Sequence, residues 1–286
     1  MKSIYKSKEG KQSILDLYDR QLRELQIEYN DIYINTSYGK THLIECGNTA
    51  GKPLLVFHGG NATTAYNLKY CDFLLPYFHI YAVDTIGHPG KSAEVCLSPY
   101  HQEYGKWASE VITQLGYESI ACFGGSFGAG ILVKTMCVAP TKVEKSVLLV
   151  PSAIKNAPSI KSMNMMFPMI MYWITHKEDW FVKCILPMAI TRENISQDIL
   201  ETARRSIDYA QVKSIMPQNE PLKQLQKYHN PVLVMASERD CLFPAKNVIP
   251  QAKKAWSHAT TYLLKDRGHI NNLTSEEKQM IIDFLI

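Results

Sequence analysis

The residues of this chain that could most readily do chemistry surround a single serine. Ser126 lies in the segment Gly124 to Gly128, which follows the apolar run Ile120 to Phe123 and precedes residues with helical spacing. Glycines two positions before and after a serine permit a sharp turn between a strand and a helix, where larger side chains would collide. Such a turn exposes the hydroxyl and directs the next backbone N–H toward the same point. We therefore predict that Ser126 is a nucleophile.

A serine hydroxyl needs a base to take its proton, and that base needs a carboxylate to orient it. Among the nine histidines, His269 follows the last strand-like run, residues 261–264. Asp240 follows the run 232–235 in the same way. Functional residues of α/β sheets gather at the carboxyl ends of the strands, where Ser126 also lies. The sequence thus predicts that His269 is the general base and that Asp240 orients it.

Two other acidic residues compete with Asp240. Asp266 is a close sequence neighbour of His269 and is expected to share its loop rather than to face it across the site. Glu238 remains a rival, because a shift of two residues within the loop would exchange it with Asp240. No Asp or Glu occurs from residue 146 to residue 177, so the preceding strand offers no acid. That absence favours Asp240.

The tetrahedral intermediate also needs hydrogen-bond donors for its oxyanion, and backbone N–H groups are suitable because their positions are fixed in advance. The segment Phe57 to Asn61 contains His58 and two glycines after a buried run. We predict that the oxyanion hole consists of the N–H groups of Gly60 and Phe127. His58 is interpreted as a residue that orients this loop by hydrogen bonds.

The elements that position these residues follow from the hydrophobic pattern. Continuous apolar runs alternate with helical stretches, as expected for strands buried on both faces of a parallel sheet. The runs are residues 54–57, 80–83, 120–123, 147–150, 232–235 and 261–264. Residues 31–36 and 41–46 alternate around a turn-like segment and predict an antiparallel hairpin, and residues 11–26 predict an amphipathic helix. The fold class is α/β, a mostly parallel central sheet flanked by helices.

One interval, residues 154–229, lacks strand-like runs and predicts an inserted helical cap. We expect a single domain over residues 1–286, with an N-terminal helical arm over residues 1–28. Methionines and aromatics crowd residues 163–173, and such flexible apolar side chains suit an adaptable pocket wall. From this stretch we predict that Met166, Met169 and Trp173 line the substrate pocket. The alternative is an ordinary buried helix within the cap.

Composition excludes several classes of function. The net charge of +4 arises from 31 basic and 27 acidic residues spread along the chain, which argues against a nucleic-acid partner. Seven cysteines without metal-site spacing predict free thiols, no metal and no disulfide framework. The N-terminus lacks the pattern of a signal peptide, and the longest apolar stretch is too short to span a membrane. We expect a cytoplasmic protein that needs no cofactor.

With these residues in place, the chain resembles the α/β-hydrolase superfamily, in its branch of capped carboxylesterase-like enzymes. The resemblance rests on the serine turn, on the His-Gly-Gly loop at residues 58–60, on the segment Asp84 to Ser92, and on the order Ser126, Asp240, His269. It extends from about residue 30 to the end of the chain. It implies hydrolysis of a small-molecule ester through an acyl-enzyme. The apolar stretch at residues 163–173 favours small to medium apolar acyl groups.

Three alternatives stand beside esterase activity. The segment Gly124 to Gly128 also resembles the serine turn of proline iminopeptidases, which leaves an aminopeptidase-like or C–C-bond hydrolase open, although Asn61 departs from their His-Gly-Gly-Pro loop. Haloalkane dehalogenases and epoxide hydrolases resemble the fold but carry aspartate where Ser126 stands. A non-catalytic binding protein on a hydrolase scaffold is the alternative from another class. Labelling of Ser126 by a fluorophosphonate would distinguish it from an enzyme.

Overall fold

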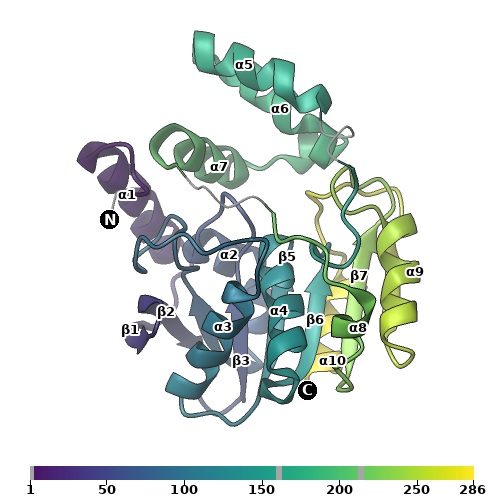
Figure 1. Ribbon diagram of the computed structural model, residues 1–286. Helices are drawn as coiled ribbons and strands as arrows, with labels where there is room; N and C mark the ends of the chain where they lie inside the picture. The colour runs from purple at the N-terminus through teal and green to yellow at the C-terminus, as the bar shows by residue number, and fades with distance from the viewer. Residues whose placement is uncertain (1–2, 159–162, 212–215) are drawn as a thin grey trace.

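A single eight-stranded sheet forms the centre of the protein in a computed structural model, which describes residues 3–158, 163–211 and 216–286 (Figure 1). Its strands are β1 (Tyr29–Thr36), β2 (Gly39–Gly47), β3 (Lys52–Phe57), β4 (Phe78–Val83), β5 (Ile120–Gly125), β6 (Val143–Leu149), β7 (Val232–Ser237) and β8 (Thr260–Leu264). They lie in the order β1-β2-β4-β3-β5-β6-β7-β8. The pairs β1–β2 and β2–β4 are antiparallel, and all the other pairs are parallel. The predicted hairpin and the six predicted parallel strands are confirmed.

Helices cover both faces of this sheet. They are α1 (Lys8–Glu24), α2 (Thr64–Tyr70), α3 (Glu103–Gln114), α4 (Phe127–Val138), α8 (Leu222–Leu225), α9 (Ala245–Ala255) and α10 (Ser275–Leu285). Alternate residues of a strand point to opposite faces, so in β3 Leu55 and Phe57 pack toward α3, α4 and α9, whereas Leu54 and Val56 pack toward α1, α2 and α10. The strands β3 to β7 therefore each contribute to two apolar layers, which explains why their sequences are continuously hydrophobic.

Three further helices lie above the carboxyl ends of the strands, between β6 and β7 (Figure 1). They are α5 (Met166–Thr175), α6 (Glu178–Ala189) and α7 (Gln197–Tyr209). We propose that they belong to the predicted cap of residues 154–229, within one domain of residues 1–286, although α8 at the end of that interval packs against α4 and α9. Residues 159–162 and 212–215 of that cap, and residues 1–2 of the arm, lie outside the described residues. In the parts of the cap that the structure describes, no segment forms a strand.

The sheet and the helices that flank it form the base of the molecule. The N-terminal arm contacts both this base and the cap. Tyr5 forms an isolated antiparallel bridge with Ala210, just beyond α7. Farther along the arm, the Gln21 amide donates a 3.0 Å hydrogen bond to Thr202 of α7, while Tyr18 packs against the sheet. The helix of the arm begins three residues earlier than the predicted residue 11. Within the described ranges, every helix falls short of the length and hydrophobicity needed to cross a membrane.

Candidate active site

Ser126 occupies the turn between β5 and α4, and its backbone is strained there, with φ of 54° and ψ of −113°. The two glycines of the motif are required by their surroundings. A Cβ atom on Gly124 would lie 2.8 Å from the backbone of Gly128, and one on Gly128 would lie 2.4 Å from the carbonyl oxygen of Phe57. Only Gly125 has space for a side chain. The turn leaves the Ser126 side chain at the floor of a cavity.

A chain of hydrogen bonds joins Ser126 to the two residues predicted to activate it. His269 Nε2 lies 2.9 Å from Ser126 Oγ, and His269 Nδ1 lies 2.8 Å from Asp240 Oδ2. The Nδ1–H therefore donates to the carboxylate, and Nε2 is free to accept the serine proton. Asp240 is buried, and its Oδ1 accepts hydrogen bonds from the N–H groups of Leu242 and Phe243. The carboxylate is thus held in one orientation from both sides.

The two rival acids point elsewhere. Glu238 is exposed, and its Oε2 accepts a 2.9 Å hydrogen bond from the N–H of Asp266. Asp266 is also exposed and has a positive φ of 56°, which fits a tight turn after β8. The hydrogen bond between Asp266 and Glu238 lies on the solvent side of the loop that carries His269. Neither carboxylate is among the hydrogen-bond partners of the His269 ring.

Gly60 and Phe127, the two residues predicted to supply N–H groups to the oxyanion, are neighbours in space. Phe127 is the first residue of α4, where helical N–H groups have no acceptor within the helix and the helix dipole favours negative charge. Gly60 lines the same cavity as Ser126. A Cβ built on Gly60 would lie 3.7 Å from Phe127 Cβ. Gly60 therefore lies beside the residue that follows Ser126 in the chain.

Ser126 and His269 open into a cavity of about 350 Å³ between the base and the cap. Its walls are mainly apolar and come from α2, from the cap helices and from the segments that follow several strands of the sheet. The larger apolar side chains are those of Tyr66, Tyr70, Met165, Met169, Ile185, Met188, Ile199, Ile207, Met216, Leu242 and Ile270. None of the described lining residues is Asp, Glu, Lys or Arg. The cavity therefore suits a neutral, mostly apolar ligand.

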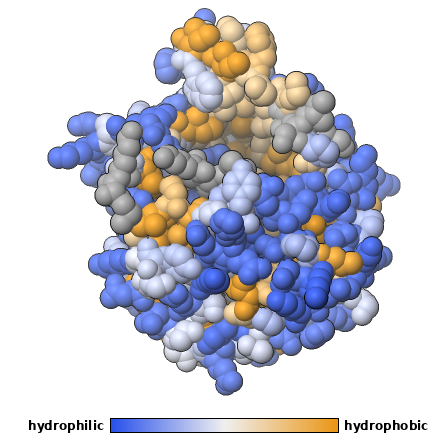
Figure 2. All heavy atoms as spheres, viewed as in Figure 1, coloured by the Kyte–Doolittle hydropathy of each residue, from blue (hydrophilic) through white to orange (hydrophobic). Residues whose placement is uncertain are grey.

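Of the three residues predicted from the methionine-rich stretch, the structure places one at the cavity and two outside it. Met169 lines the cavity, but Met166 and Trp173 do not, and 59% and 57% of their surfaces are exposed. Helical period alone does not separate these residues, because Met166, Met169 and Trp173 also lie three or four positions apart. The rotation of α5 about its axis decides which of its faces meets the cavity. Met165, Met169 and Tyr172 face inward, whereas the opposite face of α5 leaves apolar side chains on the surface, at the top of Figure 2.

Sequence analysis missed the cavity walls contributed by α6 and α7. Ile199, Ala203 and Ile207 follow each other at four-residue spacing on one face of α7 and line the cavity. This periodicity is visible in the sequence and could have identified the wall. The last turn of α6 also touches the site, because Ile270 N–H donates a 2.9 Å hydrogen bond to the carbonyl of Met188. Gly268 is needed beside it, since a Cβ there would lie 2.2 Å from that oxygen.

Taken with the sheet order and the serine turn, this arrangement defines the class of the protein: the chain has the α/β-hydrolase fold. A family model described as the alpha/beta hydrolase fold matches residues 52–178. In the part of the chain that the structure describes, no group of three or more His, Cys, Asp or Glu residues is arranged to hold a metal ion.

Among the individual proteins that the chain resembles are some named as carboxylesterases. It is 31% identical to carboxylesterase YbfK of Bacillus subtilis (strain 168) over 135 residues, 47% of this chain and 46% of that protein. The match thus spans about half the length of that relative. The crystal structure of carboxylesterase CesB (YbfK) from Bacillus subtilis superposes with a TM-score of 0.81 and 21% identity, covering 97% of this chain and 98% of the other. The crystal structure of naproxen esterase (carboxylesterase NP) from Bacillus subtilis superposes with a TM-score of 0.80 and 17% identity. That superposition covers 98% of this chain and 100% of the other. At these identities the structural likeness is one of fold.

Proposed function

We propose that the protein is a carboxylesterase that hydrolyses esters of small to medium apolar acids through an acyl-enzyme on Ser126. Ser126 Oγ attacks the carbonyl carbon while His269 Nε2 takes the hydroxyl proton. The oxyanion accepts hydrogen bonds from Gly60 and Phe127, and His269 returns the proton to the departing alcohol oxygen. Water then attacks the acyl-enzyme by the same steps and releases the acid.

The observation that carries this proposal is the unbroken hydrogen-bond chain from Asp240 through His269 to Ser126, with distances of 2.8 and 2.9 Å. Each contact fits one protonation state, with Nδ1 as donor and Nε2 as acceptor, which is the state that a general base requires. The similarity to proteins named as carboxylesterases supports an ester as the substrate.

The cavity supports the apolar acyl preference and argues against an aminopeptidase. A substrate with a free α-ammonium group needs a carboxylate near the serine, and none of the described lining residues supplies one. An aliphatic or aryl acyl group instead matches the wall of Met, Ile and Leu side chains. A C–C-bond hydrolase on the same three residues remains an outcome of the test below.

The test is a spectrophotometric panel of p-nitrophenyl esters from acetyl to octanoyl, run beside alanine and proline arylamides. We expect ester turnover that peaks at an intermediate chain length, little arylamide turnover, and fluorophosphonate labelling that disappears in Ser126→Ala. Arylamide turnover that exceeds ester turnover would replace the proposal with the aminopeptidase. Labelling of Ser126 with neither class turned over would direct attention to C–C-bond substrates.

We also propose that the protein works in the cytoplasm. The support is that all seven cysteines are free thiols in the structure, five of them buried. Burial raises the pKa of the Cys46 thiol to about 12, so this side chain is unreactive in the folded protein. Seven thiols should react with Ellman's reagent after denaturation without reductant. A smaller number would indicate disulfides and a different compartment.

A further inference from the structure

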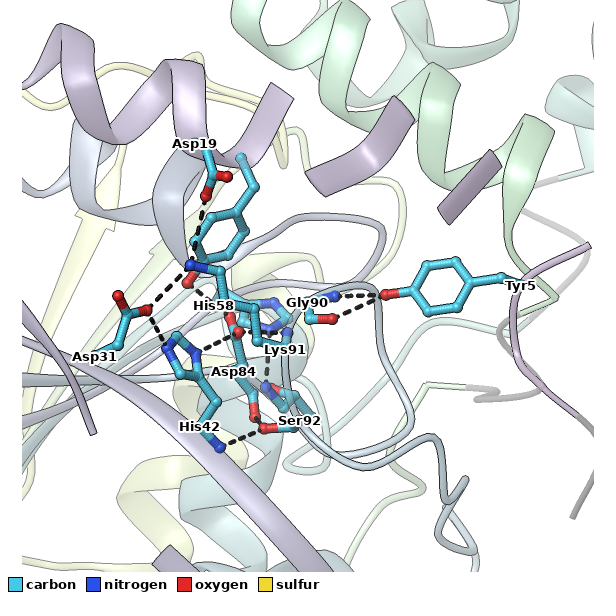
Figure 3. A network of polar contacts seen from close by, with 11 residues as sticks. Tyr5, Asp19, Asp31, His42, His58, Asp84, Gly90, Lys91 and Ser92 are labelled. Atoms are coloured by element: carbon cyan, nitrogen blue, oxygen red, sulfur yellow. Dashed lines mark hydrogen bonds and ion pairs between the residues drawn. The ribbon is translucent and has the colours of Figure 1, made fainter. Parts of the chain in front are cut away.

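A network of ionisable groups lies near His58, which belongs to the same loop as Gly60 (Figure 3). At its centre is His42 of β2, whose side chain is fully buried. Its Nδ1 lies 2.7 Å from Asp84 Oδ2 and its Nε2 lies 2.7 Å from Asp31 Oδ1. Because both ring nitrogens face carboxylates, the imidazolium form satisfies the arrangement by donating to both. None of these three residues lines the cavity around Ser126.

Asp84 uses this charge pair to fix the loop that follows β4, residues 84–92. Its buried carboxylate also accepts the N–H of Lys91 at 2.8 Å and the hydroxyl of Tyr18 at 3.2 Å. Gly90, with φ of 155°, lies so close that a Cβ there would be 2.7 Å from the carboxyl carbon. The N-terminal arm closes the other side, where the Tyr5 hydroxyl bonds both the N–H and the carbonyl of Gly90 (Figure 3).

The fixed loop holds His58 in one tautomer. The N–H of Thr85, the residue after Asp84, lies 3.1 Å from His58 Nε2, which must therefore be the unprotonated nitrogen. His58 Nδ1 lies 2.8 Å from the carbonyl oxygen of Gly59 and must be the donor. Both partners are backbone groups with a fixed role, so the neutral Nδ1–H form follows from geometry. Burial agrees with this form, because it lowers the pKa of His58.

The hydrogen bond to Gly59 determines where the next N–H points. The Gly59 carbonyl and the Gly60 N–H belong to one planar peptide unit, and the described chain has no cis peptide bond. In a trans unit these two groups point in opposite directions. A carbonyl held against the buried His58 ring therefore directs the Gly60 N–H away from that ring. Gly60 lines the cavity beside Ser126, which is the direction in which this N–H is needed.

We propose that Asp84, His42 and His58 are positioning residues that aim the Gly60 N–H at the oxyanion. The proposal rests on the proposed function, because it assigns a purpose to the donor of that reaction. It extends the site to a charge pair that touches neither substrate nor Ser126. The Asp84–His42 pair fixes the Thr85 N–H, that N–H selects the His58 tautomer, and the tautomer orients the peptide.

The experiment compares His58→Gln with His58→Asn in the full chain. The Asn amide nitrogen can occupy the place of Nδ1 and still donate to Gly59, whereas Gln reaches only the place of Nε2. Loss of one oxyanion donor typically lowers kcat by about 10²- to 10³-fold, so a misdirected donor should cost roughly 10- to 100-fold in His58→Gln and far less in His58→Asn. KM should change little. The Ki of a trifluoromethyl ketone, whose adduct carries an oxyanion, should rise in parallel with the loss of kcat.

Two further variants test the charge pair. Asp84→Asn should lower kcat and raise the Ki of the trifluoromethyl ketone by the same factor. Asp31→Asn should have a smaller effect on both values, because Asp31 is partly exposed. His79→Asn is the matched control, because it breaks another histidine–carboxylate pair, to Glu45, away from this loop. Melting temperatures identify any variant that fails to fold, in which case Asp31→Asn replaces Asp84→Asn.

The outcomes separate the two proposals. Folded His58→Gln with kcat within about twofold of the wild type would overturn the positioning role while esterase activity stands. Normal kcat in folded Asp84→Asn and Asp31→Asn, beside a loss in His58→Gln, would overturn the part assigned to the charge pair. If the wild type neither turns over esters nor reacts with a fluorophosphonate at Ser126, the proposed function fails and the positioning role fails with it.

Discussion

The base and the cap solve different problems with different kinds of structure. In the base, Ser126, Asp240 and His269 come from three loops at one sheet edge, and backbone contacts fix each loop. In the cap, the cavity wall is one face of each of several helices, and the opposite face of α5 is exposed and equally apolar. The comparison teaches that reacting groups are set by local turns, whereas a binding surface is set by how whole helices are rotated.

The largest loss of activity should come from replacing Ser126 or His269, which lie in the base of the molecule. Ser126→Ala and His269→Ala should each lower kcat by about 10⁴- to 10⁶-fold, and the double variant should lose little more than either single one, because the residues act as a unit. The melting temperature should remain close to that of the wild type. Ester kinetics and thermal melts check this result. Wild-type turnover by Ser126→Ala would refute the mechanism.

Next in size is the acid of the same hydrogen-bond chain. Asp240→Asn should lower kcat by roughly 10⁴-fold, since an amide favours the wrong imidazole tautomer. Glu238→Gln is the matched control, because Glu238 lies two residues away and bonds the backbone of Asp266. Its kcat should be nearly normal. The reverse pattern in steady-state kinetics would show that the acid had been assigned to the wrong residue.

Substitutions at the junction of the base and the cap should lower the free energy of unfolding rather than kcat. Lys134 of α4 and Glu220, near the end of the cap interval, form a buried ion pair with a 2.6 Å contact. Lys134→Met leaves Glu220 buried without its partner and should cost about 3–5 kcal/mol in the free energy of unfolding. Arg204→Met, which breaks an exposed pair with Glu178, should cost less than about 1 kcal/mol.

Urea denaturation would measure both losses. Adding Glu220→Gln to Lys134→Met should restore part of the loss, because the neutral amide is cheaper to bury than an unpaired carboxylate. Equal costs for Lys134→Met and Arg204→Met would mean that burial of the first pair has no energetic consequence.

The two faces of α5 provide a smaller and more direct comparison. Replacing Met165 and Met169 together with serine should raise KM for hexanoyl esters more than for acetyl esters, by up to about 0.8 kcal/mol per methylene that loses burial. The same change at Met166 and Trp173, on the exposed face, should leave both values unaltered. KM series for the two double variants check this. A shift with the outer-face variant would mean that this face also binds the acyl chain.

The smallest effect concerns pH. Burial alone would raise the pKa of Asp84, but its hydrogen bonds and the charge of His42 lower it below the ordinary value of 3.8. The unfolded chain then binds this proton more tightly than the native state does, so the carboxylate stabilises the fold above that value and the contribution disappears at lower pH. The pKa of His58 is also lowered, from 6.5, so its neutral form adds stability above 6.5 that is lost on acidification.

Thermal melts across the acidic range would measure these contributions. The melting temperature should begin to fall below about pH 6.5 and fall further toward pH 3. His58→Asn should flatten the first part of the curve and Asp84→Asn the second. Unchanged slopes in both variants would contradict the assigned shifts.

Sequence alone could predict the fold and the positions of the reacting residues for physical reasons. Gly124 and Gly128 are required by backbone contacts within one turn, so their spacing is a local signal. Strands buried on both faces are continuously apolar, which made β3 to β7 recognisable. The cap differed, because Met166 and Met169 have the same chemical character and only the rotation of α5 places one of them in the cavity. The pairing of His42 with Asp84 depends on the register of β2 against β4, and the sequence gives no direct sign of it.

The hydrogen bond from Ile270 to the Met188 carbonyl means that the cap is not an exchangeable module. The last turn of α6 ends on the loop of His269, so one backbone oxygen both terminates a cap helix and holds the loop of the predicted base. A chimera that imports another hydrolase's cap should therefore retain residues 186–190 of this chain and exchange only the helices around them. Because this hydrogen bond ties α6 to the His269 loop, we expect substrate to enter where α5 and α7 border the cavity.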